Sequence, residues 1–407
     1  MPFLGKAGET PRESLGIGRS GQAMEPSLLN PSRRQFLAGL LGTGAALSLS
    51  GRAAWAQPQF DGELAKGLEQ ALDLAKQRGR SPGLMAGVWR GETGAWTAVR
   101  GVTALGGSQP PTFPMHTRVG SVTKTMVGTL ALQLVDEGKV ALHESVDRWY
   151  PQLPRAQEIT VEMLGRMSSG IASYTFDDHF TDQYFGHPEK AWSEDELLKI
   201  AFAGPRVFEP GKGFQYCNTN FVMLGQIVEK VRGISLDQAL RKHLFEPLKM
   251  TRSSYPMGTE LPEPYWSGCT LQGTPDGTTQ PVDATHWSPT FGAGAGQAVS
   301  DFHDLSLWAR ALGRGTTLKP ETQKARLLPN TYSSKGDRHY CFGVGQENGW
   351  IGHAGTLPGY NTQVAYLPER DISIVVMANT DMESEHGLPA VDAFELLAAA
   401  IAPDRKP

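Results

Sequence analysis

Strand-like segments at both ends of the chain restrict the possible folds more than any other feature. Near the N-terminus, residues 84–90 and 95–102 are joined by Gly91-Glu92-Thr93-Gly94, and residues 363–367 and 372–378 form a similar pair near the C-terminus. Both patterns are typical of β-hairpins. The sequence therefore predicts an α/β protein of the α+β type, in which one antiparallel sheet, flanked by helices, is closed by both termini.

Helical patterns fill the interval between the two strand pairs. Apolar residues recur at helical spacing in residues 63–77, from Ser121 onward, in 194–202, in 221–231, from a possible cap at Ser300 to about 312, and in 388–401. Much of this lies in an insertion that covers roughly residues 138–290. We therefore expect one domain over residues 57–407 with an inserted, mostly helical subdomain.

Composition narrows the classes of partner. A net charge of −4, with 20% charged residues in 407, favours neither nucleic acid nor a membrane surface. The Cys and His spacings match no metal site, and we expect Asp177-Asp178-His179 to be an exposed loop. Gly292-Ala293-Gly294-Ala295-Gly296 lacks the glycine spacing of a dinucleotide fingerprint, so we expect it to let the backbone pass close to a site. The sequence predicts no metal and no cofactor.

Residues 1–56 have the pattern of an export signal. Ser32-Arg33-Arg34-Gln35-Phe36-Leu37 is followed by a Gly- and Ala-rich apolar run to Gly51 and then by Ala54-Trp55-Ala56. Twin arginines, an apolar run and a small-x-small site are together typical of a twin-arginine signal peptide. The run is short and rich in glycine for a membrane span. We expect a periplasmic or extracellular mature chain without a membrane span.

The stretch Gly120-Ser121-Val122-Thr123-Lys124 opens the first of the central helices. Ser121 has an ordinary role available as an N-cap. Lys124 has none, because a capping box would place Glu or Gln there and a cation near a helix N-terminus opposes the dipole. One helical turn brings Lys124 beside Ser121, where an amine could take the hydroxyl proton. The stretch therefore indicates an activated serine nucleophile.

Tyr216-Cys217-Asn218 is a second candidate motif. A phenol can relay a proton between a nucleophile and a leaving group, and an amide can orient a substrate carbonyl. Structural interpretations compete with this one. Asn218 would also suit the cap of the following helix, and Tyr216 would suit the core.

His353-Ala354-Gly355-Thr356 is a third candidate and follows the strand-like Trp350-Ile351-Gly352. Gly355 would let a substrate backbone approach an edge strand. The N–H group of Thr356 could then be the second donor of an oxyanion hole, beside the N–H group of Ser121. The competing interpretation is a glycine-rich strand end with an exposed histidine.

Together, the three motifs resemble those of the penicillin-recognising serine hydrolases, which include class C β-lactamases, serine D-alanyl-D-alanine carboxypeptidases and family VIII esterases. The resemblance covers nearly all of the chain after the signal. It extends to Ile159-Thr160-Val161 running to Ser168-Ser169-Gly170-Ile171, to Phe208-Glu209-Pro210-Gly211, to Ala298-Val299-Ser300 before Asp304-Leu305, and to the closing hairpin at 368–379.

The resemblance implies a role for each motif residue. Ser121 would be the acylated nucleophile, Lys124 its helper and Tyr216 the proton relay, although the sequence does not decide whether Lys124 or Tyr216 is the base. The substrate-binding residues would be Asn218, His353, Gly355 and Thr356, with the N–H groups of Ser121 and Thr356 forming the oxyanion hole.

Three departures from the family pattern bear on the substrate. Met167 stands where many relatives have His, and Cys217 replaces a small residue and is expected to be a buried neutral thiol. Ala354 stands where peptidases and β-lactamases usually carry a hydroxyl that grips the substrate carboxylate. This last change weakens the prediction of a carboxylate-bearing substrate and favours an esterase.

The resemblance and the export signal predict an exported serine hydrolase, most like a D-alanyl-D-alanine carboxypeptidase of cell-wall peptides. Its substrate would be a peptide or another small molecule. A carboxylesterase and a class C-like β-lactamase are the alternatives among enzymes. A non-catalytic penicillin-binding or sensing module is the alternative from a different class.

Overall fold

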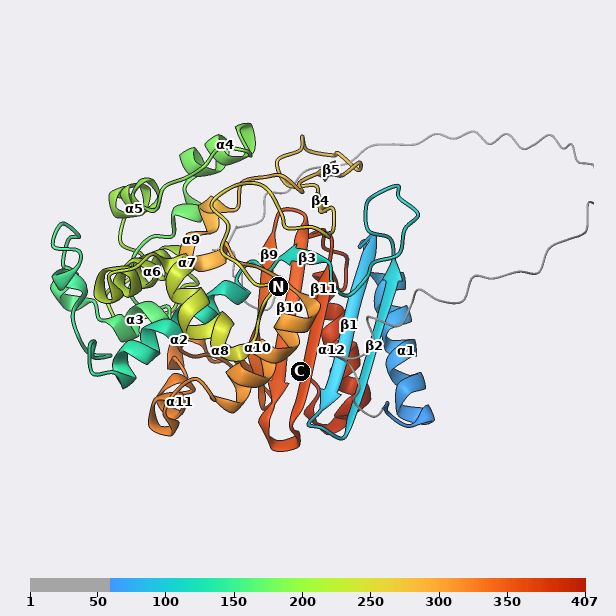
Figure 1. Ribbon diagram of the computed structural model, residues 1–407. Coiled ribbons are helices and arrows are strands. Elements are labelled where there is room, and N and C mark those ends of the chain that lie inside the picture. The colour runs from blue at the N-terminus through green and yellow to red at the C-terminus, as the bar shows by residue number, and fades with distance from the viewer. Residues whose placement is uncertain (1–58) are drawn as a thin grey trace, which may run out of the picture. The chain divides into compact units, whose positions relative to one another are not determined.

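The computed structural model describes residues 59–407, so the predicted signal at residues 1–56 lies outside the described residues. A seven-stranded antiparallel sheet has the order β2-β1-β11-β10-β9-β8-β7 (Figure 1). Its strands are β1 (Gly83–Arg90), β2 (Gly94–Gly101), β7 (Arg338–Tyr340), β8 (Gly345–Glu347), β9 (Trp350–Leu357), β10 (Tyr360–Leu367) and β11 (Ile372–Ala378). Because β1 pairs with β11, strands from the two ends of the chain lie side by side. The predicted fold class is confirmed.

Two terminal helices cover one face of the sheet. They are α1 (Gly62–Arg78) and α12 (Pro389–Ile401), which confirms the helices predicted at 63–77 and 388–401. Leu84, Ala86 and Val88 alternate along β1 and join the core beneath these helices. Successive side chains of a strand point to opposite faces, and the residues that alternate with these three are buried on the other face. Each fully buried leucine there contributes about 1.5–3 kcal/mol of hydrophobic stabilisation.

Helices α2 (Val122–Asp136) and α10 (Phe302–Arg314) pack on the other face, α2 against β9 and α10 against β10 and β11. The cap predicted for α10 was wrong by one residue. The side chain of Asp301 accepts a hydrogen bond from the backbone N–H of Asp304 and caps the helix. Ser300 lies within β6 (Val299–Asp301), which pairs with β3 (His116–Arg118), so the strand extends through it.

The helical insertion lies to one side of the sheet, next to β9 (Figure 1). The helices predicted at 194–202 and 221–231 are confirmed as α5 and α6. The loop predicted at 177–179 was wrong, because the side chain of Asp177 accepts the N–H of Phe180 and caps α4. The remaining elements are α3 (Val161–Gly165), α4 (Asp178–Gly186), α5 (Glu194–Ala203), α6 (Asn218–Arg232), α7 (Leu236–Leu240), a π-helical turn (Arg241–Phe245), α8 (Glu246–Leu248), β4 (Cys269–Thr270), β5 (Val282–Asp283), α9 (Ala293–Gly296) and α11 (Pro320–Arg326).

Within residues 59–407, no helix combines the length and the apolar character that a membrane crossing requires. The three cysteines, Cys217, Cys269 and Cys341, are all buried and unpaired.

Candidate active site

The start of α2 brings a serine and a lysine together. Ser121 precedes the helix with φ −64° and ψ −5°, and its side chain makes no capping hydrogen bond. The N-cap interpretation was therefore wrong. Instead, the Oγ atom of Ser121 lies 2.9 Å from the Nζ atom of Lys124. The nucleophile and its candidate base are at hydrogen-bond distance.

The environment of Lys124 favours a neutral amine. Its side chain is completely buried, and Nζ donates a hydrogen bond to the carbonyl oxygen of Ala295 at 2.7 Å. Burial lowers the pKa of Lys124 well below its ordinary value, and the Cys217 thiol only opposes that shift. A carbonyl oxygen can only accept a hydrogen bond, so the contact with Ala295 uses an N–H of the amine. The lone pair of the nitrogen is therefore free to accept the Ser121 proton. Of the two candidate bases, the geometry favours Lys124.

The glycine-rich segment supplies the carbonyl that holds this amine. Gly294 passes so close to α6 that a Cβ there would lie 2.3 Å from the carbonyl oxygen of Phe221. Ala293 takes φ +39°, which is rare for a residue with a side chain. Because the backbone passes so close to α6, the carbonyl oxygen of Ala295 lies within hydrogen-bond distance of Lys124. The prediction that this segment lets the backbone approach the site is confirmed.

Tyr216 lies beside the same amine. Its ring centre is 4.9 Å from the Nζ atom of Lys124, and the residue is buried. Among the described residues, its hydroxyl has no partner with hydrogen-bond geometry. Burial raises the pKa of Tyr216 well above its ordinary value, while the Ser121 hydroxyl lowers it. Tyr216 therefore stays a phenol, which suits a proton relay better than a base.

His353 is a buried, neutral residue inside β9. The exposed-histidine interpretation was therefore wrong, and the third motif lies within the strand and not after it. Its Nδ1 atom lies 2.5 Å from the carbonyl oxygen of Ala354, and Nε2 lies 3.3 Å from the Tyr340 hydroxyl. Burial is the main cause of a His353 pKa lowered to about 3. With Nδ1–H donated to Ala354, Nε2 accepts from Tyr340.

Two glycines bring the predicted oxyanion donors together. A Cβ on Gly120 would lie 2.7 Å from the Thr356 backbone nitrogen, and one on Gly355 would lie 3.1 Å from the Ser121 nitrogen. In this turn the Val122, Thr123 and Lys124 N–H groups donate hydrogen bonds to preceding carbonyls. Ser121 is not among the backbone donors in the described chain. Its N–H is thus available beside Thr356, as an oxyanion hole requires.

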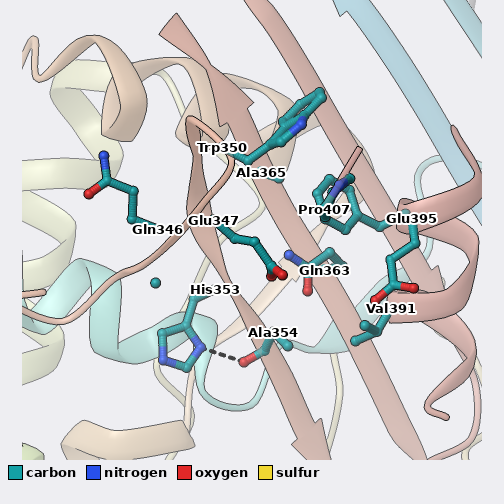
Figure 2. Close-up of a pocket in the computed structure, with 13 residues that line it drawn as sticks. Gln346, Glu347, Trp350, His353, Ala354, Gln363, Ala365, Val391, Glu395 and Pro407 are labelled. Carbon is teal, nitrogen blue, oxygen red and sulfur yellow. Dashed lines mark hydrogen bonds between the residues drawn. The ribbon is translucent and has the colours of Figure 1, made fainter. Parts of the chain in front are cut away.

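Ala354 lies on the face of β9 that α12 covers. Figure 2 shows it next to Gln363, with Glu347 and Glu395 at the same small cavity of about 50 Å³. Burial raises the pKa of Glu395, and Glu347 raises it further. The side chains at this cavity include carboxylates and amides but no lysine or arginine.

Asn218 is the first residue of α6, but its side chain does not cap the helix. Its amide donates to the Oγ1 atom of Thr175 at 3.1 Å, and its backbone N–H donates to the Ser173 hydroxyl at 3.0 Å. The capping interpretation was therefore wrong. The other predicted site residues lie around Ser121. Asn218 follows Tyr216 by two positions in the sequence, and its hydrogen bonds are made with the loop of residues 173–175.

Sequence reasoning left three contributors to this site without a defined role. Tyr340 bonds His353, and Ala295 bonds Lys124 through a backbone carbonyl that no side-chain motif could reveal. Met167 accepts hydrogen bonds from both neighbours of Tyr216. Its carbonyl accepts the N–H of Gln215 at 3.2 Å, and its sulfur accepts that of Cys217 at 3.3 Å. The departure at Met167 is thus a local anchor for the second motif.

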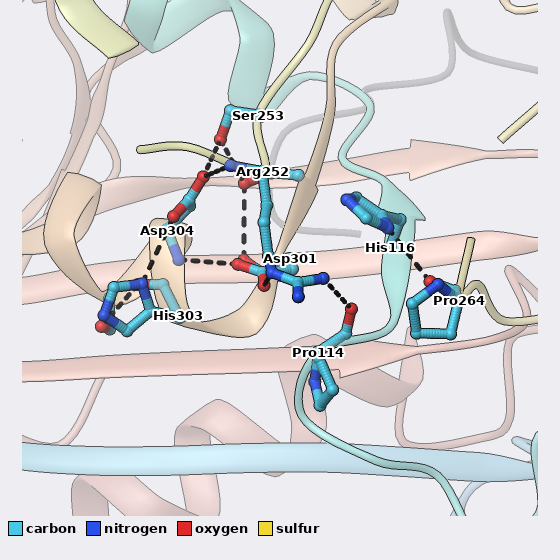
Figure 3. A network of polar contacts seen from close by, with 10 residues as sticks. Pro114, His116, Arg252, Ser253, Pro264, Asp301, His303 and Asp304 are labelled. Carbon is cyan, nitrogen blue, oxygen red and sulfur yellow. Dashed lines mark hydrogen bonds and ion pairs between the residues drawn. The ribbon is translucent and has the colours of Figure 1, made fainter. Parts of the chain in front are cut away.

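One carboxylate cluster away from Ser121 has the composition of a metal site. It contains Asp301, His303 and Asp304 (Figure 3). Arg252 approaches Asp301 at 3.6 Å, and the backbone N–H of Arg252 and the Ser253 hydroxyl bond Asp304 at 2.7 and 2.9 Å. Asp301 also accepts the N–H of Asp304 as the cap of α10, so both carboxylates already have hydrogen-bond donors or an ion-pair partner. The cluster therefore joins the 252–253 turn to α10.

The chain is similar to several known proteins. The β-lactamase family model matches residues 65–397. The putative penicillin-binding protein PbpX of Bacillus subtilis is 25% identical over 69% of this chain and 66% of its own length. The protein flp of Staphylococcus aureus is 24% identical, and the alignment covers 65% of this chain and 53% of that protein. The chain thus matches between half and two thirds of these curated relatives.

Solved structures extend the similarity. A D-stereospecific amidohydrolase from a Streptomyces species superposes with a TM-score of 0.74 and 27% identity, over 83% of this chain and 99% of that one. The D-amino acid amidase of Ochrobactrum anthropi gives a TM-score of 0.73 and 23% identity, over 84% and 99%. At that identity the second likeness concerns the fold alone. Since the family model spans most of the chain, and α2 places Ser121 beside Lys124, the protein belongs to the β-lactamase family of serine hydrolases.

Proposed function

We propose that the protein hydrolyses an amide bond of a small D-amino acid derivative through an acyl-enzyme on Ser121. The carrying observation is the 2.9 Å approach of the buried Lys124 amine to the Ser121 hydroxyl. Lys124 takes the hydroxyl proton as Oγ attacks the substrate carbonyl carbon. The N–H groups of Ser121 and Thr356 stabilise the oxyanion.

The second half of the reaction frees the acyl group. The C–N bond breaks, and the leaving amine receives a proton through Tyr216, whose ring centre lies 4.9 Å from the Lys124 amine. Water then attacks the ester carbon and gives its proton back to the site. The C–O bond to Ser121 breaks, the acid product leaves and the serine hydroxyl is restored.

The charges of the site support an amide without a free terminal carboxylate. His353 is neutral, with a pKa lowered to about 3, and Ala354 offers no hydroxyl. The likeness to a D-stereospecific amidohydrolase at 27% identity supports the same substrate class. The similarity to a penicillin-binding protein supports a D-alanyl-D-alanine carboxypeptidase as the second candidate.

A substrate panel with mass spectrometry tests the proposal. The enzyme would be mixed with D- and L-phenylalanine amide, a peptide ending in D-Ala-D-Ala, an aryl ester and a cephalosporin. We expect turnover of the D-amide above the L-amide, and loss of turnover in Ser121→Ala but not in Ser334→Ala, which alters an exposed serine. Release of D-alanine without amide turnover would replace the proposal with the carboxypeptidase. A lasting adduct on Ser121 without any turnover would indicate a penicillin-binding sensor.

Export is a separate proposal and depends on residues 32–56. We expect the full chain, fused to a reporter, to leave the cytoplasm of a host with a twin-arginine pathway. Replacing Arg33 and Arg34 by lysines should retain the fusion in the cytoplasm. Unchanged export of that variant would contradict the proposal.

A further inference from the structure

A cavity of about 430 Å³ opens beside the predicted oxyanion residue Thr356. It lies at the end of β9, and part of its wall is apolar, from Leu271, Met382 and Leu388. The backbone nitrogen and Cβ of one residue are only about 2.5 Å apart. Thr356 therefore lines this cavity and also carries the N–H group predicted to hold the substrate carbonyl, so a subsite here would lie next to that carbonyl.

Asp381 brings a buried negative charge to this cavity. Only 7% of its surface is exposed. Its Oδ1 atom accepts the N–H of Gly359 at 2.9 Å, and Oδ2 accepts the Thr270 hydroxyl at 3.0 Å and the Gln272 amide. These three donors are all neutral, so none cancels the charge. Burial raises the pKa of Asp381, but the donors oppose the shift and favour the charged form.

The rim of the cavity carries charges of both signs. Arg80 and Glu383 line it and are both exposed, so water screens their opposite charges. A buried charge acts more strongly, since a Coulomb interaction grows about fourfold as the effective dielectric constant falls from about 80 to about 20. Among the charged side chains that line the cavity, Asp381 is therefore the one whose charge is least screened by water.

We propose that this cavity is a substrate subsite for a primary ammonium group next to the scissile carbonyl, such as the free α-amino group of a D-amino acid amide. The inference rests on the proposed function and makes it more specific. The subsite admits the free amine because Asp381 attracts its charge. It disfavours an N-acylated substrate, which would bury an uncharged amide beside an unpaired carboxylate, and a carboxylate at this place, which Asp381 would repel.

Paired substrates test the subsite in the intact enzyme. D-phenylalanine p-nitroanilide carries a free ammonium group at the α-nitrogen, and its N-acetyl derivative carries an uncharged acetamide there. We expect the wild type to prefer the free amine by about tenfold or more in kcat/KM, as expected for a charge-assisted hydrogen bond. The preference should decline as pH rises through about 8, where α-amino groups lose their proton. Equal rates, or faster acylation by the acetylated substrate, would overturn the inference.

Asp381→Asn keeps the shape and removes the charge. We expect it to reduce the preference by about tenfold, through a slower reaction with the free amine, while the rate with the acetylated substrate changes little. Glu383→Gln, at the exposed rim, is the matched control and should reduce the preference less than about threefold. An unchanged preference in folded Asp381→Asn would refute the role of Asp381.

Folding and the proposed function are controlled separately. Should Asp381→Asn not fold, judged by its melting temperature, the wild-type pair and its pH dependence still decide. If neither substrate acylates Ser121, both the proposed amide hydrolysis and the subsite inference are wrong. If both substrates acylate Ser121 at equal rates, the subsite inference alone is wrong.

Discussion

Replacing Lys124 by methionine separates the chemistry of the amine from its packing. Methionine has a similar length and fills the buried space without a base. A general base contributes about 10²–10⁴ in rate, so we expect acylation of Ser121 to slow at least about a hundredfold. The measurement is the pre-steady-state acylation rate with a reporter ester, followed by mass spectrometry of the Ser121 peptide. Near-normal acylation would remove Lys124 from the mechanism.

The same variant predicts a pH-dependent change in stability. Burial lowers the pKa of Lys124, so between its folded value and 10.5 the unfolded chain binds one proton more than the folded chain. The contribution of Lys124 to stability therefore increases as pH rises between these two values, by about 1.4 kcal/mol per pH unit. Lys124→Met lacks this dependence.

The hydrogen bond from Lys124 to the Ala295 carbonyl stabilises the wild type, so losing it lowers the stability of Lys124→Met. Without the amine, that buried carbonyl oxygen loses its donor, at a cost of about 1–3 kcal/mol. Below pH 10.5 the wild type also bears the cost of neutralising the buried lysine, and this cost grows as pH falls. We therefore expect the variant to gain stability relative to the wild type as pH is lowered from 10 to 7. Urea unfolding at pH 7, 8, 9 and 10 gives the difference. A difference that does not change with pH would refute the buried neutral amine.

Three further changes test other parts of the site and fold. Tyr216→Phe should lower kcat about a hundredfold and leave the melting temperature nearly unchanged, because the lost hydroxyl has no partner in the described chain; normal kcat would exclude the relay. Gly355→Ala should abolish acylation and lower the melting temperature, since its Cβ would lie 1.9 Å from the Val119 carbonyl oxygen, whereas Gly62→Ala, with open space around it, should do neither; an active Gly355→Ala would contradict the oxyanion geometry. Burial, with a contribution from Glu229, raises the pKa of Glu194 to about 7 from 4.5. The wild type therefore loses up to about 3 kcal/mol of stability as pH rises from about 4.5 to 7. Glu194→Gln should be more stable at pH 8 and equal at pH 4.5 in urea unfolding, and an equal stability at both pH values would contradict the raised pKa.

The sequence predicted those parts of the fold that depend on local pattern. The β1–β2 hairpin, the terminal helices and the position of Ser121 one turn from Lys124 follow from periodicity and turn chemistry, which act over a few residues. The resemblance supplied the residues of the site. Their arrangement around Ser121 is read from the structure.

The sequence alone could not exclude the structural interpretations of Ser121 and His353, because long-range contacts decide against them. The burial of His353 depends on Tyr340 and the segments that pack around β9. The Ser121 hydroxyl bonds Lys124, whose amine is also held by the carbonyl of Ala295, 171 positions away from Lys124. Backbone groups that arrive from so far leave no signature in a local motif.

The pairing of β1 with β11 also dictates when this protein can fold. Gly87 pairs with Val375, 288 positions later. At about 5–20 residues per second, a ribosome needs roughly 15 to 60 s to make the intervening chain. During that time the apolar β1–β2 hairpin has no central neighbour, and contacts this distant in sequence form slowly. The sheet is therefore completed only after synthesis, and the nascent hairpin is a segment that a chaperone would need to shield from aggregation.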